Sequence, residues 1–237
     1  MTSLNNAVVL ITGANGGIGR EFVREALARG ASKVYATARH PRTWDDDRII
    51  PLALDVTDPA SIGAAAEAAQ DITVLINNAG ASPASASLLT LPEDEIRSNV
   101  ETNFFGPLRL ARAFAPLLKE QEAAAMVNIH SLLSWYATAG VYSVSKAALW
   151  SATNALRLEL APEGVHVLGV HVGWVDTAMA AHTTDPKLPP AVMVSRVFDA
   201  LEAGEYEVLA DEASARVKAG LSAGIVELYP QLKTPTA

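Results

Sequence analysis

Residues 7–20 read AVVLITGANGGIGR, a short apolar run followed directly by a glycine-rich turn. The glycines from Gly13 to Gly19 are spaced as Gly-x3-Gly-x-Gly. A tight turn needs glycine, close approach of backbone to a pyrophosphate needs a missing Cβ, and a helix N-terminus attracts anions. A strand, a glycine turn and a helix in this order indicate a dinucleotide-phosphate site, although a structural turn is the alternative. The expected contacts are Gly13, Asn15, Gly16, Gly17, Ile18 and Gly19.

The rest of the chain repeats the alternation of strand and helix. Apolar runs typical of strands buried on both faces cover residues 7–12, 33–38, 50–54, 73–77, 125–130, 165–172 and 205–210. Helical patterns cover residues 17–29, 59–69, 92–100, 104–120, 141–161 and 191–203. This order predicts an α/β, doubly wound Rossmann-type fold, with a mostly parallel seven-stranded sheet flanked by helices. No linker divides the sequence, so we expect one domain over residues 1–237.

Composition excludes several classes of protein. Half of the 237 residues are hydrophobic, and the net charge of −8 makes a nucleic-acid backbone a poor partner. The absence of cysteine excludes disulfides and thiolate zinc sites, and we expect no metal. The N-terminal apolar run is too short for a signal peptide or a membrane span. These features predict a cytoplasmic protein that binds neither nucleic acid nor membrane.

The end of the second predicted strand bears on the choice of dinucleotide. A ribose with a free 2′-hydroxyl is usually held by a carboxylate at this point, but the sequence here is Thr37-Ala38-Arg39-His40. A guanidinium suits a 2′-phosphate, so Arg39 predicts NADP(H) rather than NAD(H). The alternative is that Arg39 is a solvated loop cation.

Two further strand ends fit the same edge of the sheet. Asp55 and Val56 close the third strand, where an adenine is expected, and Asn78, Ala79 and Gly80 follow the fourth. Ligands of doubly wound sheets bind at the carboxyl ends of the strands. We therefore expect these residues to contact the cofactor, although each segment taken alone favours a turn over a site.

Tyr142 and Lys146 form the candidate catalytic pair. Their spacing of four residues in a helical stretch puts both side chains on one face. An ammonium beside a phenol stabilises the phenolate, so we expect Lys146 to lower the Tyr142 pKa from its ordinary value of about 10. Tyr142 would then exchange a proton with a carbonyl or alcohol oxygen.

The surroundings of this pair strengthen its interpretation. Ser131 follows the fifth strand, where its hydroxyl would hold the substrate oxygen. Pro107 has no N–H to donate to the carbonyl of Asn103, so we expect that carbonyl to be free to accept from a water. The alternative is that Asn103 is an N-cap and Pro107 lies in the first helical turn. His130 precedes Ser131, and it either tunes the site or is a satisfied buried histidine.

Over nearly its whole length the chain resembles the short-chain dehydrogenases/reductases. Four elements match in order: Thr12–Gly19, Asn77-Asn78-Ala79-Gly80, Ser131 before Tyr142-x-x-x-Lys146, and Gly173–Thr177. The resemblance implies a catalytic tetrad of Asn103, Ser131, Tyr142 and Lys146. It gives Tyr142 as acid/base, Ser131 as the group that orients the substrate oxygen, and Lys146 as ribose ligand. It also implies that the Asn103 carbonyl holds a relay water, that Tyr142 and Lys146 contact the cofactor, and that Gly173, Val175 and Thr177 do so too.

The sequence departs from the family at two places. Val172 stands where the family usually has proline, and Ser131 lies only 11 residues before Tyr142, which leaves Ser134 as a competitor for its role. Loops expected to border the substrate carry Trp135, Tyr136 and Trp174, and residues 178–190 are the expected substrate lid. The short lid suggests an open pocket, and the aromatic residues suggest a bulky or apolar substrate.

The function that these residues predict is hydride transfer between NADP(H) and a carbonyl or secondary alcohol, as in a carbonyl reductase. The alternative of another class is a dinucleotide sensor or scaffold without turnover. A sugar-nucleotide epimerase or dehydratase uses a similar pair, but the glycine spacing and the short C-terminal region disfavour it. The family also implies a homodimer or homotetramer, with residues 104–120 and 141–161 at the interface.

Overall fold

The computed structural model describes residues 2–233 and contains one sheet of seven strands. Its strands are β1 (Val8–Thr12), β2 (Lys33–Ala38), β3 (Ile49–Ala53), β4 (Val74–Asn77), β5 (Ala124–Ile129), β6 (Val165–His171) and β7 (Glu207–Leu209). They lie in the order β3-β2-β1-β4-β5-β6-β7, and every pairing is parallel. The strand order reverses between β1 and β4, which is the position where open α/β sheets bind ligands.

Eight α-helices accompany the sheet within the described residues. They are α1 (Gly17–Ala28), α2 (Pro59–Ala68), α3 (Glu93–Val100), α4 (Gly106–Lys119), α5 (Val141–Leu160), α6 (Pro190–Ala203), α7 (Glu212–Gly220) and α8 (Ile225–Leu228). Local chemistry explains where some of them start: the Asp58 side chain accepts from Ala60 N just before α2, and the Asp211 side chain accepts from Ser214 N just before α7. The capped start of α7 was visible in the sequence, but we did not predict α7 or α8.

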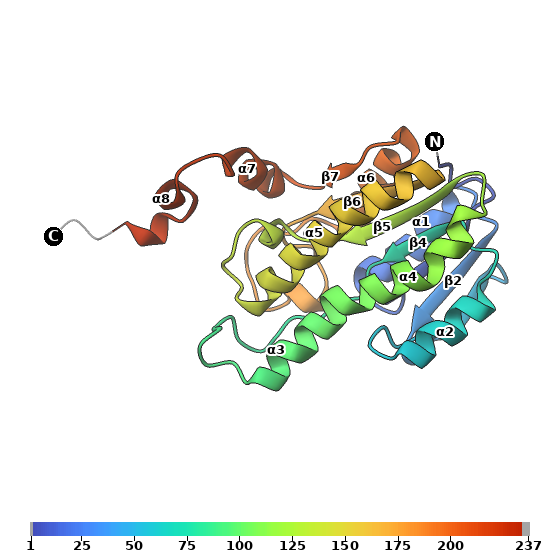
Figure 1. Cartoon of the computed structure of the whole chain (residues 1–237), viewed down its shortest axis with the longest axis horizontal. Coiled ribbons are helices and arrows are strands. Elements are labelled where there is room, and N and C mark those ends of the chain that lie inside the picture. The colour runs from blue at the N-terminus through green and yellow to red at the C-terminus, as the bar shows by residue number, and fades with distance from the viewer. Residues whose placement is uncertain (1, 234–237) are drawn as a thin grey trace.

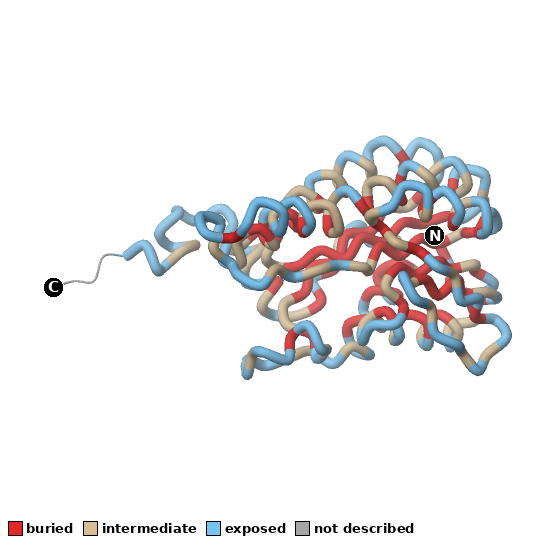
Figure 2. Tube along the Cα trace, turned by 90° about the horizontal axis from the view of Figure 1, so that it is seen from below, coloured by how far each residue is buried: buried red, intermediate tan, exposed pale blue. Residues whose placement is uncertain are grey.

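The helices cover both faces of the sheet, as Figure 1 shows. On one face α1 and α6 pack against each other through Phe22 and Phe198, whose rings meet edge to face at 5.4 Å. On the other face α2, α4 and α5 bury residues such as Phe114 and Leu118 against the strands. The sheet is buried throughout its centre (Figure 2), which explains why its strands are almost continuously apolar.

The C-terminal segment of the described chain lies apart from this compact body. After β7 the segment with α7 and α8 extends away from the sheet (Figure 1), and α8 exposes Ile225.

The α/β doubly wound fold is confirmed, and the sheet is parallel in all its pairings rather than mostly parallel. No helix in residues 2–233 is both long and apolar enough to cross a membrane.

Candidate active site

The carboxyl ends of β1 and β4 are tied together by Thr12. Its Oγ1 accepts from the backbone N–H groups of Asn78 and Ala79, both at 2.9 Å, and the Asn78 side chain donates to the Thr12 carbonyl at 2.8 Å. Asn78, Ala79 and Gly80 are thereby held beside Gly13, on the glycine turn. Thr12 opens the glycine motif, but we did not predict this role for its side chain.

The glycine turn packs too tightly for side chains at its centre. A Cβ at Gly19 would lie 2.2 Å from the Gly13 carbonyl oxygen, so only glycine fits there. Gly16 is the N-cap residue of α1, whose first turn contains no acidic residue. Thr177, from the loop after β6, lies directly over Gly17. The turn thus leaves backbone amides at a helix N-terminus, a suitable arrangement for phosphate.

The loops after β2 and β3 extend the same edge. Asn15 Nδ2 donates to the His40 carbonyl at 2.7 Å, which joins the glycine turn to the end of β2, where Arg39 is exposed. The Asp55 carboxylate accepts from the backbone and hydroxyl of Thr57, and these bonds hold its pKa below the ordinary value, with a smaller contribution from the charge of Arg39. Val56, the next residue, is buried.

Tyr142 and Lys146 lie on the first turns of α5. Lys146 is buried, its Nζ donates to the Ile129 carbonyl at 2.9 Å, and it lies 5.7 Å from the centre of the Tyr142 ring. Gly80 approaches them, since a Cβ there would lie 3.6 Å from Lys146 Nζ. The pair therefore stands at the ends of β4 and β5.

Burial dominates the pKa values of this pair. It raises the pKa of Tyr142 to about 12, and a side-chain hydrogen bond with Ser131 offsets the increase only in part. Burial also lowers the pKa of Lys146 to about 8. The Tyr142 pKa of the chain by itself is therefore raised rather than lowered as we expected, because burial disfavours the phenolate.

Ser131 caps a short 3-10 turn immediately after β5. Its Oγ accepts from Leu133 N at 3.2 Å and donates to the Val172 carbonyl at 3.3 Å. The Ser134 hydroxyl accepts from Ser131 N at 3.4 Å, so it serves the backbone of the same turn. Of the two hydroxyls, only that of Ser131 affects the Tyr142 pKa, and the Ser134 hydroxyl supports the Ser131 backbone.

Asn103 lies in a π-helical turn, Glu101–Phe105, that joins α3 to α4. Such turns are often found at functional sites. The structure corrects the predicted helix over residues 104–120, because α4 begins only at Gly106, with Pro107 in its first turn and Phe105 as its N-cap. The buried Asn103 side chain bonds both the N–H and the carbonyl of Ala81, at 2.8 and 2.9 Å, and Ser145 Oγ at 3.1 Å. It therefore fixes the loop after β4 against α5.

The aromatic residues expected around the substrate have different environments. Trp135 is only 8% exposed and stacks on His171. Tyr136 is half-buried and stacks on Tyr229 of the C-terminal segment, with ring centres 5.1 Å apart. Trp174 Nε1 donates to Asp185 at 3.1 Å. Only Tyr136 and Trp174 keep partly exposed surfaces.

The loop after β6 is held near its two ends by a hydrogen bond and a β-bridge. Gly173 N donates to Asp211 Oδ2 at 2.7 Å, a contact that sequence reasoning missed because the two residues are 38 positions apart. Val175 is buried and pairs with Leu188 in an isolated bridge. Residues 178–190, the expected lid, start with a 3-10 turn and end where α6 begins.

The family model of the short chain dehydrogenases matches residues 7–188. This chain belongs to the short-chain dehydrogenase family. An NADPH-dependent 1-acyldihydroxyacetone phosphate reductase of Schizosaccharomyces pombe is 37% identical to it over 201 residues, which cover 80% of this chain and 67% of that protein. The predicted family is confirmed, and the protein is a short-chain dehydrogenase/reductase oxidoreductase.

Solved structures of other short-chain dehydrogenases agree with the fold. A short chain dehydrogenase from Burkholderia cenocepacia, in complex with NADP, has a TM-score of 0.91 and 35% identity, and the match covers 98% of this chain and 100% of that one. The NADPH-bound carbonyl reductase from chicken fatty liver has a TM-score of 0.78 and 30% identity, over 85% and 88% of the two chains.

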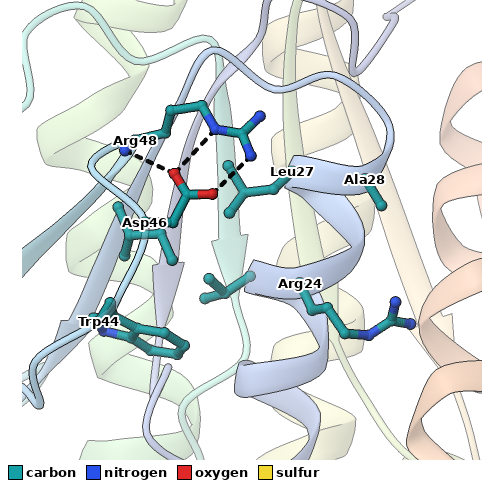
Figure 3. Close-up of a pocket in the computed structure, with 8 residues that line it drawn as sticks. Arg24, Leu27, Ala28, Trp44, Asp46 and Arg48 are labelled. Carbon is teal, nitrogen blue, oxygen red and sulfur yellow. Dashed lines mark hydrogen bonds and ion pairs between the residues drawn. The ribbon is translucent and has the colours of Figure 1, made fainter.

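A separate pocket of about 370 Å³ lies between α1 and the loop before β3 (Figure 3). Leu27 and Trp44 line it, and the Arg48 side chain lies across the Asp46 carboxylate, with hydrogen bonds of 2.7 and 3.0 Å. Its residues come from the second half of α1 and the start of β3, at the amino edge of the sheet. None of the predicted site residues lines this pocket, so it is distinct from the site of this short-chain dehydrogenase.

Proposed function

We propose that this short-chain dehydrogenase is an NADP(H)-dependent carbonyl reductase, which transfers a hydride between the nicotinamide and a carbonyl or secondary alcohol carbon. The proposal depends on one observation above all. Ser131, Tyr142 and Lys146 meet at the carboxyl edge of the sheet, next to the glycine turn. A sensor without turnover has no need of a buried lysine beside a partly buried phenol.

The residues of the edge fit NADP(H). The glycine turn offers backbone amides at the α1 N-terminus, and no acidic residue in that first turn repels a phosphate. Arg39 is exposed at the end of β2, where a 2′-phosphate would lie. The similar enzymes from Burkholderia cenocepacia and chicken were solved with NADP and NADPH, which supports the same choice here.

The chain's own residues supply the proton and hold the oxygen. Bound NADPH supplies the hydride that adds to the carbonyl carbon. The Tyr142 hydroxyl gives its proton to the carbonyl oxygen, and a pKa of about 12 keeps that proton in place at neutral pH until it is transferred. The Ser131 hydroxyl orients the same oxygen, and Lys146 binds the nicotinamide ribose. The Asn103 carbonyl would hold the water through which a proton returns.

The surroundings of the site suggest the kind of substrate. Tyr136 and Trp174 keep partly exposed aromatic surface, and residues 178–190 form the proposed lid. Aromatic walls bury apolar area well. We therefore propose that bulky or apolar ketones and aldehydes are the preferred carbonyl compounds.

The test is oxidation of NADPH and of NADH, followed at the nicotinamide absorbance, with a panel of ketones, aldehydes, diketones and quinones. Turnover with NADPH is expected, and Tyr142→Phe should lower it by several orders of magnitude while NADPH binding stays nearly intact. Measured NADPH binding without turnover across the panel would favour the sensor. Unchanged turnover in Tyr142→Phe would refute the role of Tyr142.

A further inference from the structure

A row of buried polar side chains crosses the core behind Ser131. Its members are Asn77 at the end of β4, Asn128 in β5, His130 just after β5, Thr153 in α5 and His171 at the end of β6. Each is at most 2% exposed. The proposed reaction uses none of them directly, and a buried polar group without a hydrogen-bond partner is costly, so their contacts need an explanation.

The contacts are continuous. Asn77 Nδ2 donates to Asn128 Oδ1 at 2.8 Å, and Asn128 Nδ2 donates to Thr153 Oγ1 at 2.9 Å. Thr153 Oγ1 lies 2.8 Å from His130 Nε2, and His130 Nδ1 lies 3.2 Å from His171 Nε2. Finally, His171 Nδ1 lies 3.1 Å from the Ser131 carbonyl oxygen. The row thus ends on the main chain of the serine that holds the substrate oxygen.

The last contact fixes the direction of the others. The Ser131 carbonyl only accepts, so His171 Nδ1 must carry a hydrogen. In a neutral imidazole the other nitrogen is an acceptor, and His130 Nδ1 must therefore donate to His171 Nε2. By the same rule His130 Nε2 accepts from the Thr153 hydroxyl. That hydroxyl has one hydrogen, so the tautomer assigned here directs it to His130 Nε2 rather than to the Leu149 carbonyl, which lies 2.7 Å from Thr153 Oγ1. Both histidines are then neutral and protonated on Nδ1.

The charges around the histidines agree with neutral rings. Burial lowers the pKa of His171 to about 3 and brings that of His130 well below its ordinary value, where His171, Lys146 and Arg157 lower it further. The nearby Glu207 carboxylate lies 3.7 Å from His171 Nε2, beyond hydrogen-bond range, and it pairs with Lys218. It does not replace His130 as the partner of His171.

We infer that His130 and His171 are positioning residues of this enzyme, which hold the Ser131 backbone in the geometry that the reaction needs. The inference rests on the role proposed for Ser131. The Ser131 carbonyl has a second donor, Ser134 N at 3.0 Å, from its own turn. Only the bond from His171 ties that carbonyl to another strand. The direction of the Ser131 hydroxyl follows from the orientation of this backbone.

The row also joins Ser131 to the helix of Tyr142. Thr153 lies eleven residues after Tyr142 on α5, which is about three turns of the same helix face. The bond between Thr153 and His130 therefore ties that face of α5 to the end of β5. Ser131 and Tyr142 are held relative to each other at this second point as well as at their own contact.

Neighbouring residues are shaped around the two rings. A Cβ at Gly169, in the middle of β6, would lie 2.7 Å from His130 Cε1, so a glycine there makes room for the imidazole. Trp135 stacks on His171 with ring centres 3.6 Å apart and 14° between planes. This packing explains why Trp135, predicted as a substrate contact, lies buried. It holds the His171 ring in the orientation that the Ser131 bond requires.

The donor and acceptor assignment of the two histidines can be measured without any substrate. Correlation spectra of ¹⁵N-labelled imidazoles distinguish the two neutral tautomers, and variants of His130 and His171 assign their signals among five histidines. We expect both rings to be protonated on Nδ1 and not to titrate between about pH 5 and 8. A ring protonated only on Nε2, or one that titrates in this range, would overturn the inference.

The positioning role is tested by two substitutions at one site. His171→Phe keeps a ring beside Trp135 but removes the donor, whereas His171→Asn keeps an amide N–H near the Nδ1 position. We expect His171→Phe to lower kcat about ten- to a hundredfold and to change the Kd of NADPH less than twofold, because only the oxygen-holding geometry is displaced. His171→Asn should recover most of kcat.

The matched control is His166→Phe in the same strand, since His166 bonds the Glu205 carbonyl at 2.7 Å, outside the row. It should keep the parent kcat. A kcat of His171→Phe within twofold of the parent, or of His171→Asn as low as that of His171→Phe, would overturn the inference. If His171→Phe does not fold, His171→Asn and the spectra decide. If the unsubstituted protein binds NADPH but reduces no carbonyl, the proposed function is contradicted. The histidine tautomers then still test the hydrogen bonds between His130, His171 and Ser131.

Discussion

Lys146 shows, at the scale of single residues, how the interior sets the chemistry of the site. The same burial that raises the pKa of Tyr142 to about 12 brings the pKa of Lys146 down to about 8. Tyr142 is therefore fully protonated near neutral pH, the state that a reductase needs, and Lys146 is still mostly charged. Of the two groups, only Lys146 loses its proton at moderately alkaline pH.

This difference predicts a pH dependence with a definite sign. In the role that we propose for it, Lys146 donates to the ribose hydroxyls in its charged form. Under that proposal, kcat/KM for NADPH should be flat near neutral pH and fall as pH rises through about 8. His130 and His171 titrate too low to add an inflection near pH 6.5. The rate is measured at saturating carbonyl substrate, with circular dichroism at each pH as the control for unfolding. A flat profile to pH 9.5 would contradict this role of Lys146.

Arg39 determines the second prediction at this scale. Its exposed guanidinium stands where a carboxylate would bind the 2′-hydroxyl of NAD(H). Arg39→Asp should therefore lower kcat/KM for NADPH about tenfold or more and raise the ratio of NADH to NADPH use, since one charge pair with a phosphate is lost. The exposed Arg42, three residues further on, supplies the control as Arg42→Asp. Equal preference for NADPH in Arg39→Asp and the parent would show that Arg39 is only a solvated cation.

At the scale of elements, the turn between β1 and α1 shapes the proposed phosphate site. Gly19 lies in the first turn of α1 with its Cα facing the Gly13 carbonyl, so the helix can begin this close to the strand end. The π-helical turn before α4 acts similarly on the other side of the site, because it turns the Asn103 side chain onto the loop after β4. The glycine turn and the π-helical turn are both short, and they position the longer helices α1 and α4.

Two glycine substitutions in helices test this reasoning. Gly19→Ala should reduce the free energy of unfolding by about 1–3 kcal/mol and weaken NADPH binding, because its Cβ would overlap the Gly13 carbonyl. Gly63→Ala in α2, where a Cβ meets no atom within 4 Å, should instead increase stability by about 0.5–1 kcal/mol. Urea unfolding and NADPH titration measure both. Equal changes in the free energy of unfolding and in NADPH binding for the two substitutions would show that close packing is not the reason for glycine at position 19.

At the scale of the whole molecule, the homodimer or homotetramer that the family resemblance implies stays a prediction. Phe105, the N-cap residue of α4, and Leu158 on α5 are 40% and 79% exposed, within the ranges 104–120 and 141–161 that we predicted as an interface.

Light scattering after size exclusion tests this prediction. We expect a mass of two or four chains of 24.9 kDa. Leu158→Glu should shift the distribution towards the single chain, because a charge would have to be buried at the contact. The exposed Leu89, outside α4 and α5, provides the control as Leu89→Glu, which should leave the mass unchanged. A single-chain mass for the parent would contradict the predicted interface.

Local patterns were sufficient for much of the fold and for the placement of the site. The strands were predictable because burial on both faces leaves continuous apolar runs, and β2 was predicted at its observed bounds, Lys33–Ala38. The glycine turn, Tyr142 and Lys146 were predictable because each depends on spacing within one turn or one helix. Parallel strands end at one edge, so the pattern also predicted that these segments converge. Their roles in the reaction stay predictions.

The tertiary structure alone decided the features that depend on distant neighbours. The pKa values of Tyr142 and Lys146 follow from the depth at which α5 meets β5, which no spacing encodes. His130 and His171 are 41 residues apart, and only the pairing of β5 with β6 brings their rings into contact. Trp135 became a packing partner of His171 for the same reason. The sequence determined which chemical groups reach the edge of the sheet, because that depends on local periodicity. The packing of the strands determined their protonation and orientation, because burial and hydrogen bonding depend on the residues that surround each group in space.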